Sequence, residues 1–271
     1  MPLGEIAVFA LAIAASGVVS GLMAGAFGIG GGMVLVPVFY QVFAILGVDE
    51  AVRMHLAVGS SLAIIVPTSL RSFTGHRVRG VADNDLLRSF YIPVPLGVVL
   101  ASLTAAHISG EGLRVIFAVI TVLVAIRLLF GRESWRIGKE IPGNPARGVI
   151  GTVIGYFSTL MGVGGGMMNN AFMTLYGRPM HQAVATSSGV GVMIAIPGTL
   201  GYIWAGWGAP GLPVASTGFV NWIAVALVIP IALIVTPWGV RLAHALSRRQ
   251  LEIAFGLFCV LVSARFFWSL A

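Results

Sequence analysis

Two glycine clusters hold the residues of this chain best suited to chemistry, Gly28-Ile-Gly-Gly-Gly32 and Gly162-Val-Gly-Gly-Gly166. Such stretches have little helix propensity and expose several backbone N–H groups. A helix that restarts after them, at Met33 and at Met167, directs its first N–H groups at the break, and a helix N-terminus favours an anion without any cationic side chain. We therefore predict an anion site at the two breaks. Its backbone part consists of Gly30, Gly31, Gly32, Gly164, Gly165 and Gly166.

Hydroxyl side chains follow each cluster at similar positions. Ser60 and Ser61 belong to the apolar run after the first cluster, and Thr186, Ser187 and Ser188 belong to a run after the second. A hydroxyl inside a membrane can donate to an oxyanion, or it can bond back to a carbonyl of its own helix. Both interpretations stay open. The substrate interpretation predicts that Ser60, Ser61, Ser187 and Ser188 line the anion site.

Two adjacent amides distinguish the second cluster from the first. Asn169 and Asn170 lie just past it, after Met167 and Met168, whereas Leu35 and Val36 stand at the equivalent positions of the first half. Buried amides need hydrogen-bond partners. We therefore predict that Asn169 and Asn170 line the same site.

The two clusters belong to an internal repeat. A shift of 134 residues superimposes seven glycine or methionine residues within a window of seventeen positions. The pairs are Gly17 with Gly151, Gly21 with Gly155, Gly28 with Gly162, Gly30 with Gly164, Gly31 with Gly165, Gly32 with Gly166, and Met33 with Met167. Gly17, Gly21 and Gly25 form a small-xxx-small face, for which we predict close helix packing. The same packing is the alternative explanation for the cluster glycines.

The composition indicates that much of this chain is surrounded by lipid. Of its 271 residues, 58% are hydrophobic and 9% are charged, against about a quarter charged in a soluble domain. Apolar runs long enough to cross about 30 Å of hydrocarbon recur along the whole length. The net charge of +7 comes from basic residues in the short loops between these runs. Membrane topogenesis explains that pattern, so we exclude nucleic acid as a partner.

Flanking charges decide how the apolar runs cross the membrane. The eight runs span residues 5–48, 55–70, 90–106, 113–130, 148–176, 182–203, 219–238 and 251–270. If each crossed once, Lys and Arg would divide ten to six between the two faces. If the two glycine-interrupted runs are hairpins that enter and leave by one face, thirteen of the sixteen share a face, which the positive-inside rule makes cytoplasmic. These are Arg71, Arg77, Arg79, Arg88, Arg127, Arg132, Arg136, Lys139, Arg147, Arg178, Arg241, Arg248 and Arg249, with Arg53, Arg114 and Arg265 opposite.

Arm length also favours hairpins. The arms of the second, residues 148–161 and 167–176, reach only about 15–21 Å at about 1.5 Å per residue. Its tip should then stop near the middle of the membrane. Irregular backbone at that depth is tolerated only when it is buried in protein or faces a water-filled cavity.

These crossings predict the fold. Each half has one glycine-broken, re-entrant-like helical hairpin plus three transmembrane helices, so the second half starts on the opposite face. We predict an all-α polytopic membrane protein of two inverted-topology repeats, a plan typical of secondary transporters. It forms a single integral membrane domain over 1–271, with repeat one at 1–130, a cytoplasmic linker at 131–147 and repeat two at 148–271. Both termini are expected to be extracytoplasmic.

Other functional classes lack the residues that they need. The single Cys259 excludes a disulfide and a cysteine-based metal site, and we predict no metal and no cofactor. No Ser or Cys sits beside a plausible base, so we predict no enzymatic activity. The nine carboxylates fall in loops or at helix ends, which leaves no acid at the midplane to bind a coupling proton. His55 and His181 are interpreted as helix-start residues at the interface rather than as proton relays.

The stretch Ala24-Gly-Ala-Phe-Gly-Ile-Gly-Gly-Gly-Met-Val-Leu-Val-Pro37 and its echo Gly162-Val-Gly-Gly-Gly-Met167 resemble the sulfite exporter TauE/SafE family, also called the toluene-sulfonate uptake permease family. The resemblance covers essentially the whole chain. It implies an integral membrane protein of the bacterial inner membrane that moves sulfite, sulfonates or related sulfur anions, often outward. The second copy has Ala171 where Pro37 stands in the first, so the two hairpins need not contribute equally.

The predicted function is therefore a secondary transporter or facilitator for sulfite or an organosulfonate, with export as the favoured direction. Its predicted partners are the small anion and the lipid bilayer, and a homo-oligomer is left open. Two alternatives remain. One is an anion channel that uses the glycine clusters as a filter, and the other is a membrane subunit or enzyme that transports nothing.

Overall fold

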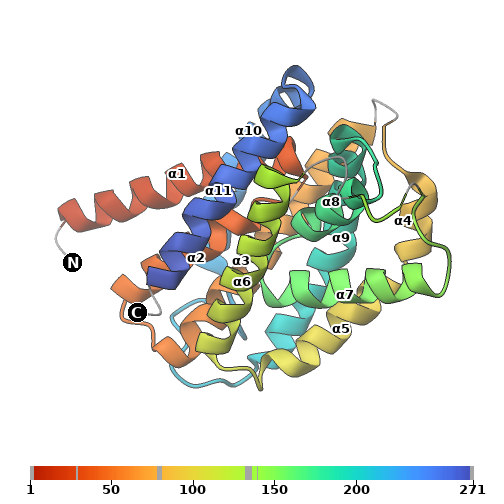
Figure 1. The fold of residues 1–271 in the computed structure, drawn as a ribbon. Helices are drawn as coiled ribbons and strands as arrows, with labels where there is room; N and C mark the ends of the chain where they lie inside the picture. The colour runs from red at the N-terminus through yellow and green to blue at the C-terminus, as the bar shows by residue number, and fades with distance from the viewer. Residues whose placement is uncertain (1–2, 29, 78–80, 132–135, 139, 269–271) are drawn as a thin grey trace.

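The computed structural model describes residues 3–28, 30–77, 81–131, 136–138 and 140–268. Within them the chain forms eleven helices and one two-stranded ribbon (Figure 1). In chain order these are α1 (Leu3–Phe27), α2 (Gly32–Ile45), α3 (Glu50–Arg77), α4 (Asn84–Phe90), α5 (Pro93–Ala105), α6 (Gly110–Phe130), α7 (Ala146–Leu160), α8 (Gly166–Leu175), α9 (Met180–Ala205), β1 (Ser216–Thr217), β2 (Val220–Asn221), α10 (Trp222–Ala245) and α11 (Arg248–Trp268). The predicted helical membrane architecture is confirmed.

Four helices of the described chain, α3, α6, α9 and α10, are long and apolar enough to cross a membrane. The pair α4 and α5 makes a fifth crossing if it is taken as one span with a bend of 43°. The short helix α4 was not predicted, because its residues lie in a segment that reads as a loop. The Asp83 carboxylate caps it by accepting from the Leu86 N–H at 3.0 Å. Pro93 starts α5 and has no N–H with which to continue α4.

Both glycine-interrupted runs fold as a helix, a break and a second helix. The arms α7 and α8 have 15 and 10 residues, in agreement with the short arms predicted. The arms of the first hairpin are unequal, since α2 has 14 residues and α1 has 25. At about 1.5 Å per residue, α1 is about 37 Å long. By length, the re-entrant description fits α2, α7 and α8 but not α1.

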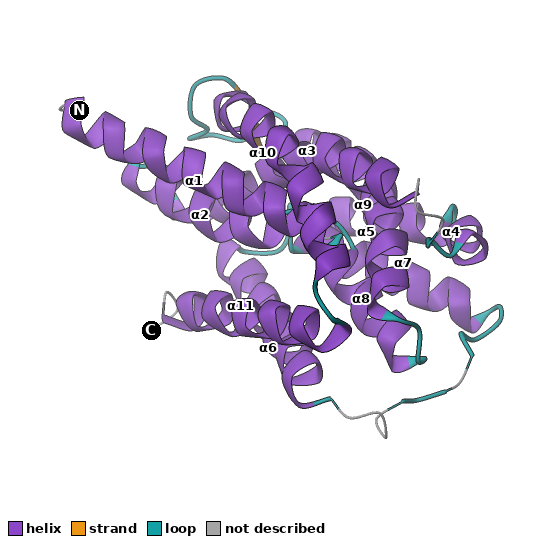
Figure 2. Ribbon diagram, turned by 90° about the horizontal axis from the view of Figure 1, so that it is seen from above, coloured by secondary structure: helices purple, strands orange, loops and turns teal. Residues whose placement is uncertain are grey.

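Helices of the two halves pack against one another. The helix α1 lies along α10, and α7 lies along α5, while α3 packs on α9 and α6 packs on α11 (Figures 1 and 2). Small residues permit the first of these contacts. A β-carbon added to Gly21 or Gly25 would meet the carbonyl oxygen of Ala232 or Thr236 on α10. The packing role predicted for these glycines is therefore confirmed.

The molecule has two distinguishable ends. The start of α1 and the end of α11 both lie on the left of Figures 1 and 2, whereas α4 lies on the right. We call these the terminal end and the basic end. At the basic end Arg249 donates to the carbonyls of Leu128 and Leu129, at 3.2 and 2.8 Å. At the terminal end Arg114 forms an ion pair of 2.7 Å with Glu50.

Candidate functional site

A glycine in the left-handed backbone conformation ends each break. Gly31 (φ 80°) precedes α2 and Gly165 (φ 64°) precedes α8, in a region where a residue with a β-carbon is strained. A new helix therefore starts at Gly32 and at Gly166, one residue earlier than predicted. The N–H groups of a helix's first turn have no acceptor within that helix.

The two breaks meet inside the molecule. A β-carbon on Gly32 would clash with the carbonyl oxygen of Gly162, so the backbones of the two halves are in direct contact there. Ser61 on α3 donates to the same oxygen at 2.9 Å. The structure thus brings together glycines that lie 130 residues apart in the chain.

Ser69 lies between the breaks and was missed by the sequence prediction. Its Oγ is 2.8 Å from the position that a β-carbon of Gly30 would take, and 2.6 Å from that of Gly191 on α9. The carbonyl oxygen of Gly164 lies 2.9 Å from the position that a β-carbon of Gly191 would take. The hydroxyls of Ser69 and of Ser20, which adjoins Gly31, are buried and have no hydrogen-bond partner among the described residues.

The amides of the second break form a chain with Ser187. Asn169 Nδ2 donates to Ser187 Oγ at 2.7 Å, and Ser187 Oγ donates to Asn170 Oδ1 at 2.7 Å. Asn170 Nδ2 donates to the carbonyl of Phe27, the last residue of α1, at 2.8 Å. This chain ties the second break to the first. In the described part of the chain, Asn169 Oδ1 is buried without a partner.

The other predicted hydroxyls bond to protein groups. Ser60 Oγ accepts from the Asn221 N–H at 2.9 Å. Ser188 Oγ donates to the Val184 carbonyl of its own helix at 3.0 Å, and it lies 2.9 Å from Ser72 Oγ. Bonding back to its own helix, one of the two readings left open by the sequence, therefore describes Ser188.

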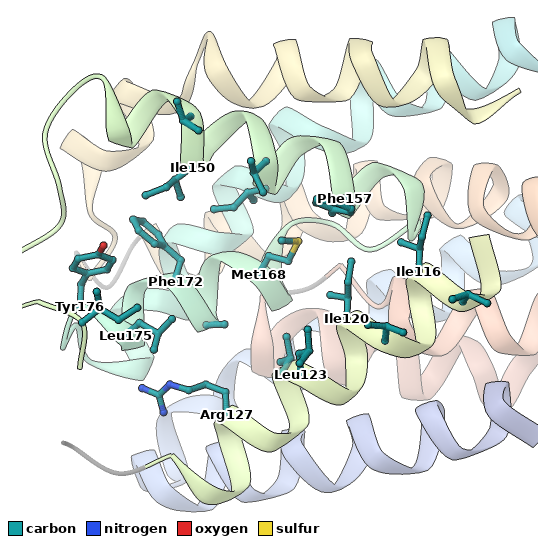
Figure 3. A pocket seen from close by; sticks show the side chains of 18 residues that line it. Ile116, Ile120, Leu123, Arg127, Ile150, Phe157, Met168, Phe172, Leu175 and Tyr176 are labelled. Carbon is teal, nitrogen blue, oxygen red and sulfur yellow. The ribbon is translucent and has the colours of Figure 1, made fainter. Parts of the chain in front are cut away.

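The twelve predicted residues are buried, so this conformation closes the breaks to solvent. A polar hollow of about 950 Å³ lies at the basic end. Its charged lining residues are Asp83, Asp85, Arg88, Glu140, Arg147 and Arg178. An apolar groove of about 860 Å³ runs between α6, α7 and α8, with Arg127 at one end (Figure 3). Neither is lined by a predicted site residue.

The chemistry available at the breaks is neutral hydrogen bonding. Backbone N–H groups, hydroxyls and amides converge there, and none of the predicted site residues carries a charge. No group of three or more His, Cys, Asp or Glu residues in the described ranges could hold a metal ion. Such groups can hold a small polar solute by hydrogen bonds.

Spanning helices combined with two broken helical pairs that meet at the centre define a polytopic α-helical membrane protein of the transporter class. Comparison of the sequence makes the assignment more specific. The chain belongs to the sulfite exporter TauE/SafE family, whose pattern matches residues 13–266.

Similar proteins carry the same general description. A probable membrane transporter protein of Haemophilus influenzae is 30% identical over 93% of this chain and 95% of its own length. Another from Methanocaldococcus jannaschii is 25% identical over 88% of this chain and 87% of its own. A third, from Bacillus subtilis, is 24% identical over 86% of this chain and 87% of its own. No solved structure matches the chain.

Proposed function

We propose that this chain is a secondary transporter or facilitator that exports a small sulfur oxyanion, sulfite or an organosulfonate, across the bacterial inner membrane. The observation that carries the proposal is the meeting of the two glycine breaks. The N–H groups of Val34 and Gly166 already donate to the Gly31 and Gly164 carbonyls. The other first-turn N–H groups of α2 and α8, with the hydroxyls of Ser20 and Ser69, are the proposed donors, and an oxyanion offers several acceptor oxygens to them. Membership of a family named for sulfite export supports this substrate class.

We further infer that residues 1–130 and 148–271 are inverted-topology repeats joined by a cytoplasmic linker at 131–147. The hairpin of α1 and α2 starts at the terminal end, whereas the hairpin of α7 and α8 starts at the basic end (Figure 1). The contact of α1 with α10 also has a counterpart in the contact of α7 with α5. Repeats of this kind commonly place a substrate near the midplane, at their interface.

The positive-inside rule would make the basic end cytoplasmic and both termini extracytoplasmic. Reporter fusions test this topology. Fusions after Arg136 and Arg248 are expected to report the cytoplasm, and fusions after Ala209 and at the C-terminus are expected to report the outside. An external Arg248 together with an internal Arg136 would contradict the double hairpin.

Two equivalent hydrogen bonds support alternate opening of the two ends. Ser60 on α3 accepts from the N–H of Asn221, which caps the start of α10. Thr186 on α9 accepts at 2.9 Å from the N–H of Asp83, which caps the start of α4. Each bond joins a central helix of one half to a helix start of the other half. Breaking one while keeping the other would open the interior to one side only, as alternating access requires.

The polar hollow is the proposed entrance from the basic end. Gln182 lines it, and Thr186 lies one turn further along α9 with its hydroxyl bonded to the Gln182 carbonyl at 2.8 Å. Ser187, the next residue, belongs to the amide chain of the second break. A polar path thus leads from the hollow toward the site. The three arginines of the hollow are balanced by its three carboxylates, so it offers polar contacts without a net charge.

Flux into or out of liposomes separates the candidate functions. Purified protein is expected to give saturable sulfite efflux that external sulfite accelerates. Flux that rises linearly without saturation would favour the channel. No flux of sulfite, sulfate, thiosulfate, taurine or sulfoacetate would favour the subunit or enzyme that transports nothing.

Ser69 provides a residue-level test. Ser69→Ala removes one donor and is expected to weaken sulfite binding by about 1 kcal/mol, which is roughly fivefold. Ser102→Ala is the matched control, because Ser102 is also buried but bonds to the Val98 carbonyl of its own helix at 2.8 Å. If the two variants bind sulfite with equal affinity, Ser69 does not contact the anion.

A further inference from the structure

The amide chain of the second break fixes which way each of its side chains points. Its anchor is the carbonyl oxygen of Phe27, 2.8 Å from Asn170 Nδ2. A carbonyl oxygen only accepts, so the nitrogen of the Asn170 amide faces it and the oxygen faces Ser187. Ser187 Oγ gives its single proton to that oxygen at 2.7 Å, and only lone pairs are left for Asn169. The amide nitrogen of Asn169 must therefore face Ser187, which it does at 2.7 Å.

The anchor of the chain is itself held by α3. The helix α1 ends at Phe27, so its last carbonyls lack donors within the helix. Ser72 donates to the Ala24 carbonyl at 2.9 Å. His76, whose Nδ1 lies 3.3 Å from Nε2 of His244 on α10, has its own Nε2 3.0 Å from the next carbonyl oxygen of α1. The end of α1 therefore cannot turn without breaking several bonds, and the orientation set there is passed along the whole chain.

Asn169 is left with a buried acceptor at the far end of the chain. Its Nδ2 also donates to Met173 Sδ at 3.5 Å, so both of its hydrogens have acceptors. Its Oδ1 has no partner among the described residues, and the residue is fully buried. Turning the amide over would not help, because the oxygen would then face the lone pairs of Ser187. A buried polar atom without a partner costs free energy, which makes this oxygen a candidate to bind a solute.

This acceptor adjoins the donors of the second break. The Asn169 N–H bonds to the Gly165 carbonyl at 2.9 Å, which places the residue one turn into α8. Helix side chains lean toward the N-terminus, so its amide lies beside the first turn. The N–H groups of Met167 and Met168 belong to that turn and have no acceptor within α8. The site therefore offers donors to one part of a solute and an acceptor to another.

We propose that Asn169 Oδ1 selects, among the anions that the breaks can hold, those with a hydrogen-bond donor of their own. The preferred class is a hydroxyalkanesulfonate or an aminoalkanesulfonate. Its sulfonate oxygens accept from the break, and its O–H or N–H donates to Asn169. This inference rests on the transport function proposed above. An anion with acceptors alone leaves Asn169 Oδ1 unpaired or sets an oxygen against it, which lowers affinity.

Two sulfonates of nearly equal shape test the acceptor in the unaltered protein. Hydroxyethanesulfonate ends in a hydroxyl where propanesulfonate ends in a methyl group, and both carry one negative charge. In titration calorimetry on the full chain in detergent, hydroxyethanesulfonate is expected to bind at least about tenfold more tightly. Sulfoacetate ends in a carboxylate, which would face Asn169 Oδ1, so it should bind more weakly than hydroxyethanesulfonate.

Two variants separate the acceptor from the residue that positions it. Asn169→Leu removes the acceptor, so hydroxyethanesulfonate and propanesulfonate should bind within about twofold of each other. Ser187→Ala frees the Asn169 amide to present its nitrogen, so sulfoacetate should bind at least about threefold more tightly than to the wild type. If Ser187 served only the fold, its loss would lower affinity for every probe. Ser102→Ala is the control, because Ser102 is buried but bonds within its own helix, and it should retain the wild-type order.

The selective role of Asn169 fails on either of two results. Equal binding of hydroxyethanesulfonate and propanesulfonate to the wild type would overturn it, as would a preference that survives in Asn169→Leu. If Asn169→Leu does not fold, the wild-type comparison and the response of sulfoacetate to Ser187→Ala still decide. Binding of sulfite without any preference among the sulfonates would overturn this inference alone. Binding of neither sulfite nor any sulfonate would overturn the transport function as well.

Discussion

The two glycine breaks are related by sequence, yet they are held in different ways. At the first break the backbone predominates, with Gly28, Gly30 and Gly31 at φ values of 67°, 66° and 80°. The apolar Leu35 and Val36 follow in α2 and are buried. This break is shaped by conformations that glycine alone adopts without strain.

At the second break, side chains share the task. Gly162 and Gly165 both have a φ of 64°, and the side chains of Asn169 and Asn170 bond to Ser187 and to the end of α1. The two copies of a repeated segment can therefore be stabilised by different interactions. The first break is held by backbone conformation, whereas side-chain hydrogen bonds also hold the second and tie it to the end of α1.

The largest expected effect is that of Gly31→Ala compared with Gly165→Ala. A β-carbon on Gly31 would overlap Ser20 Oγ and lie 2.6 Å from the Ser20 carbonyl oxygen, which is backbone. At Gly165 it would meet Ile194 Cδ1 at 2.6 Å, the end of a flexible side chain. We expect Gly31→Ala to abolish flux and to lower the unfolding temperature in detergent much more than Gly165→Ala.

Gly47→Ala is the matched control, since its φ of 74° is similar but nothing lies within 4 Å of the added carbon. It should cost about 1–2 kcal/mol from backbone strain alone. The larger changes Gly31→Leu and Gly165→Leu are both expected to stop transport while the protein still inserts. Equal losses at Gly31 and Gly165 in the alanine variants would contradict the difference drawn between the breaks.

The amides sharpen the comparison at the next level. Asn170→Leu leaves the Phe27 carbonyl without its donor and Ser187 without its acceptor, so it should destabilise the fold by about 1–3 kcal/mol. Asn169→Leu keeps the bond to Phe27 and should mainly lower affinity for the anion. Thermal unfolding and ligand binding, measured on both variants, distinguish the two roles. Asn84→Ala, at an exposed position, is the control. If the Asn170→Leu protein is as stable as this control, the hydrogen bonds of Asn170 do not stabilise the fold.

The smallest expected effect concerns the bonds at the two ends. Ser60→Ala leaves a buried N–H of Asn221 without an acceptor, whereas the N–H of Asp83 freed by Thr186→Val is half-buried and can bond to water. We expect about 1–2 kcal/mol of destabilisation for Ser60→Ala and less than about 1 kcal/mol for Thr186→Val. Chemical denaturation in detergent measures both. A larger loss of stability for Thr186→Val than for Ser60→Ala would contradict this order.

Features encoded locally were predicted well. The glycine clusters interrupt long apolar runs, so the two helix breaks and the short arms α7 and α8 follow from propensity and length, whereas the full length of α1 does not. The helix α4 was missed because it has only 7 residues and depends on one capping carboxylate, Asp83, in a polar segment. Local signals at that scale do not distinguish a capped turn of helix from a loop.

Features made by distant contacts could not be predicted in the same way. His244 and His76 lie 168 residues apart, and Asn221 lies 161 residues from Ser60. Nothing in either neighbourhood indicates its partner. Ser69 could have been suspected, because it belongs to the repeated block Pro67-Thr-Ser-Leu, but its place between the breaks is set by the packing of α3 on α9.

The packing of α1 on α10 has a consequence for how the protein is made. A β-carbon on Gly17 would lie 3.1 Å from Ile231 Cβ across this seam, so α1 is completed by a helix that is made much later in translation. At about 5–20 residues per second, the small-residue face of α1 waits on the order of 10–40 s for its partner. During that interval its glycines offer neighbouring helices the close approach that α10 later takes. The small-residue face of α1 therefore lacks its final partner until α10 has been made.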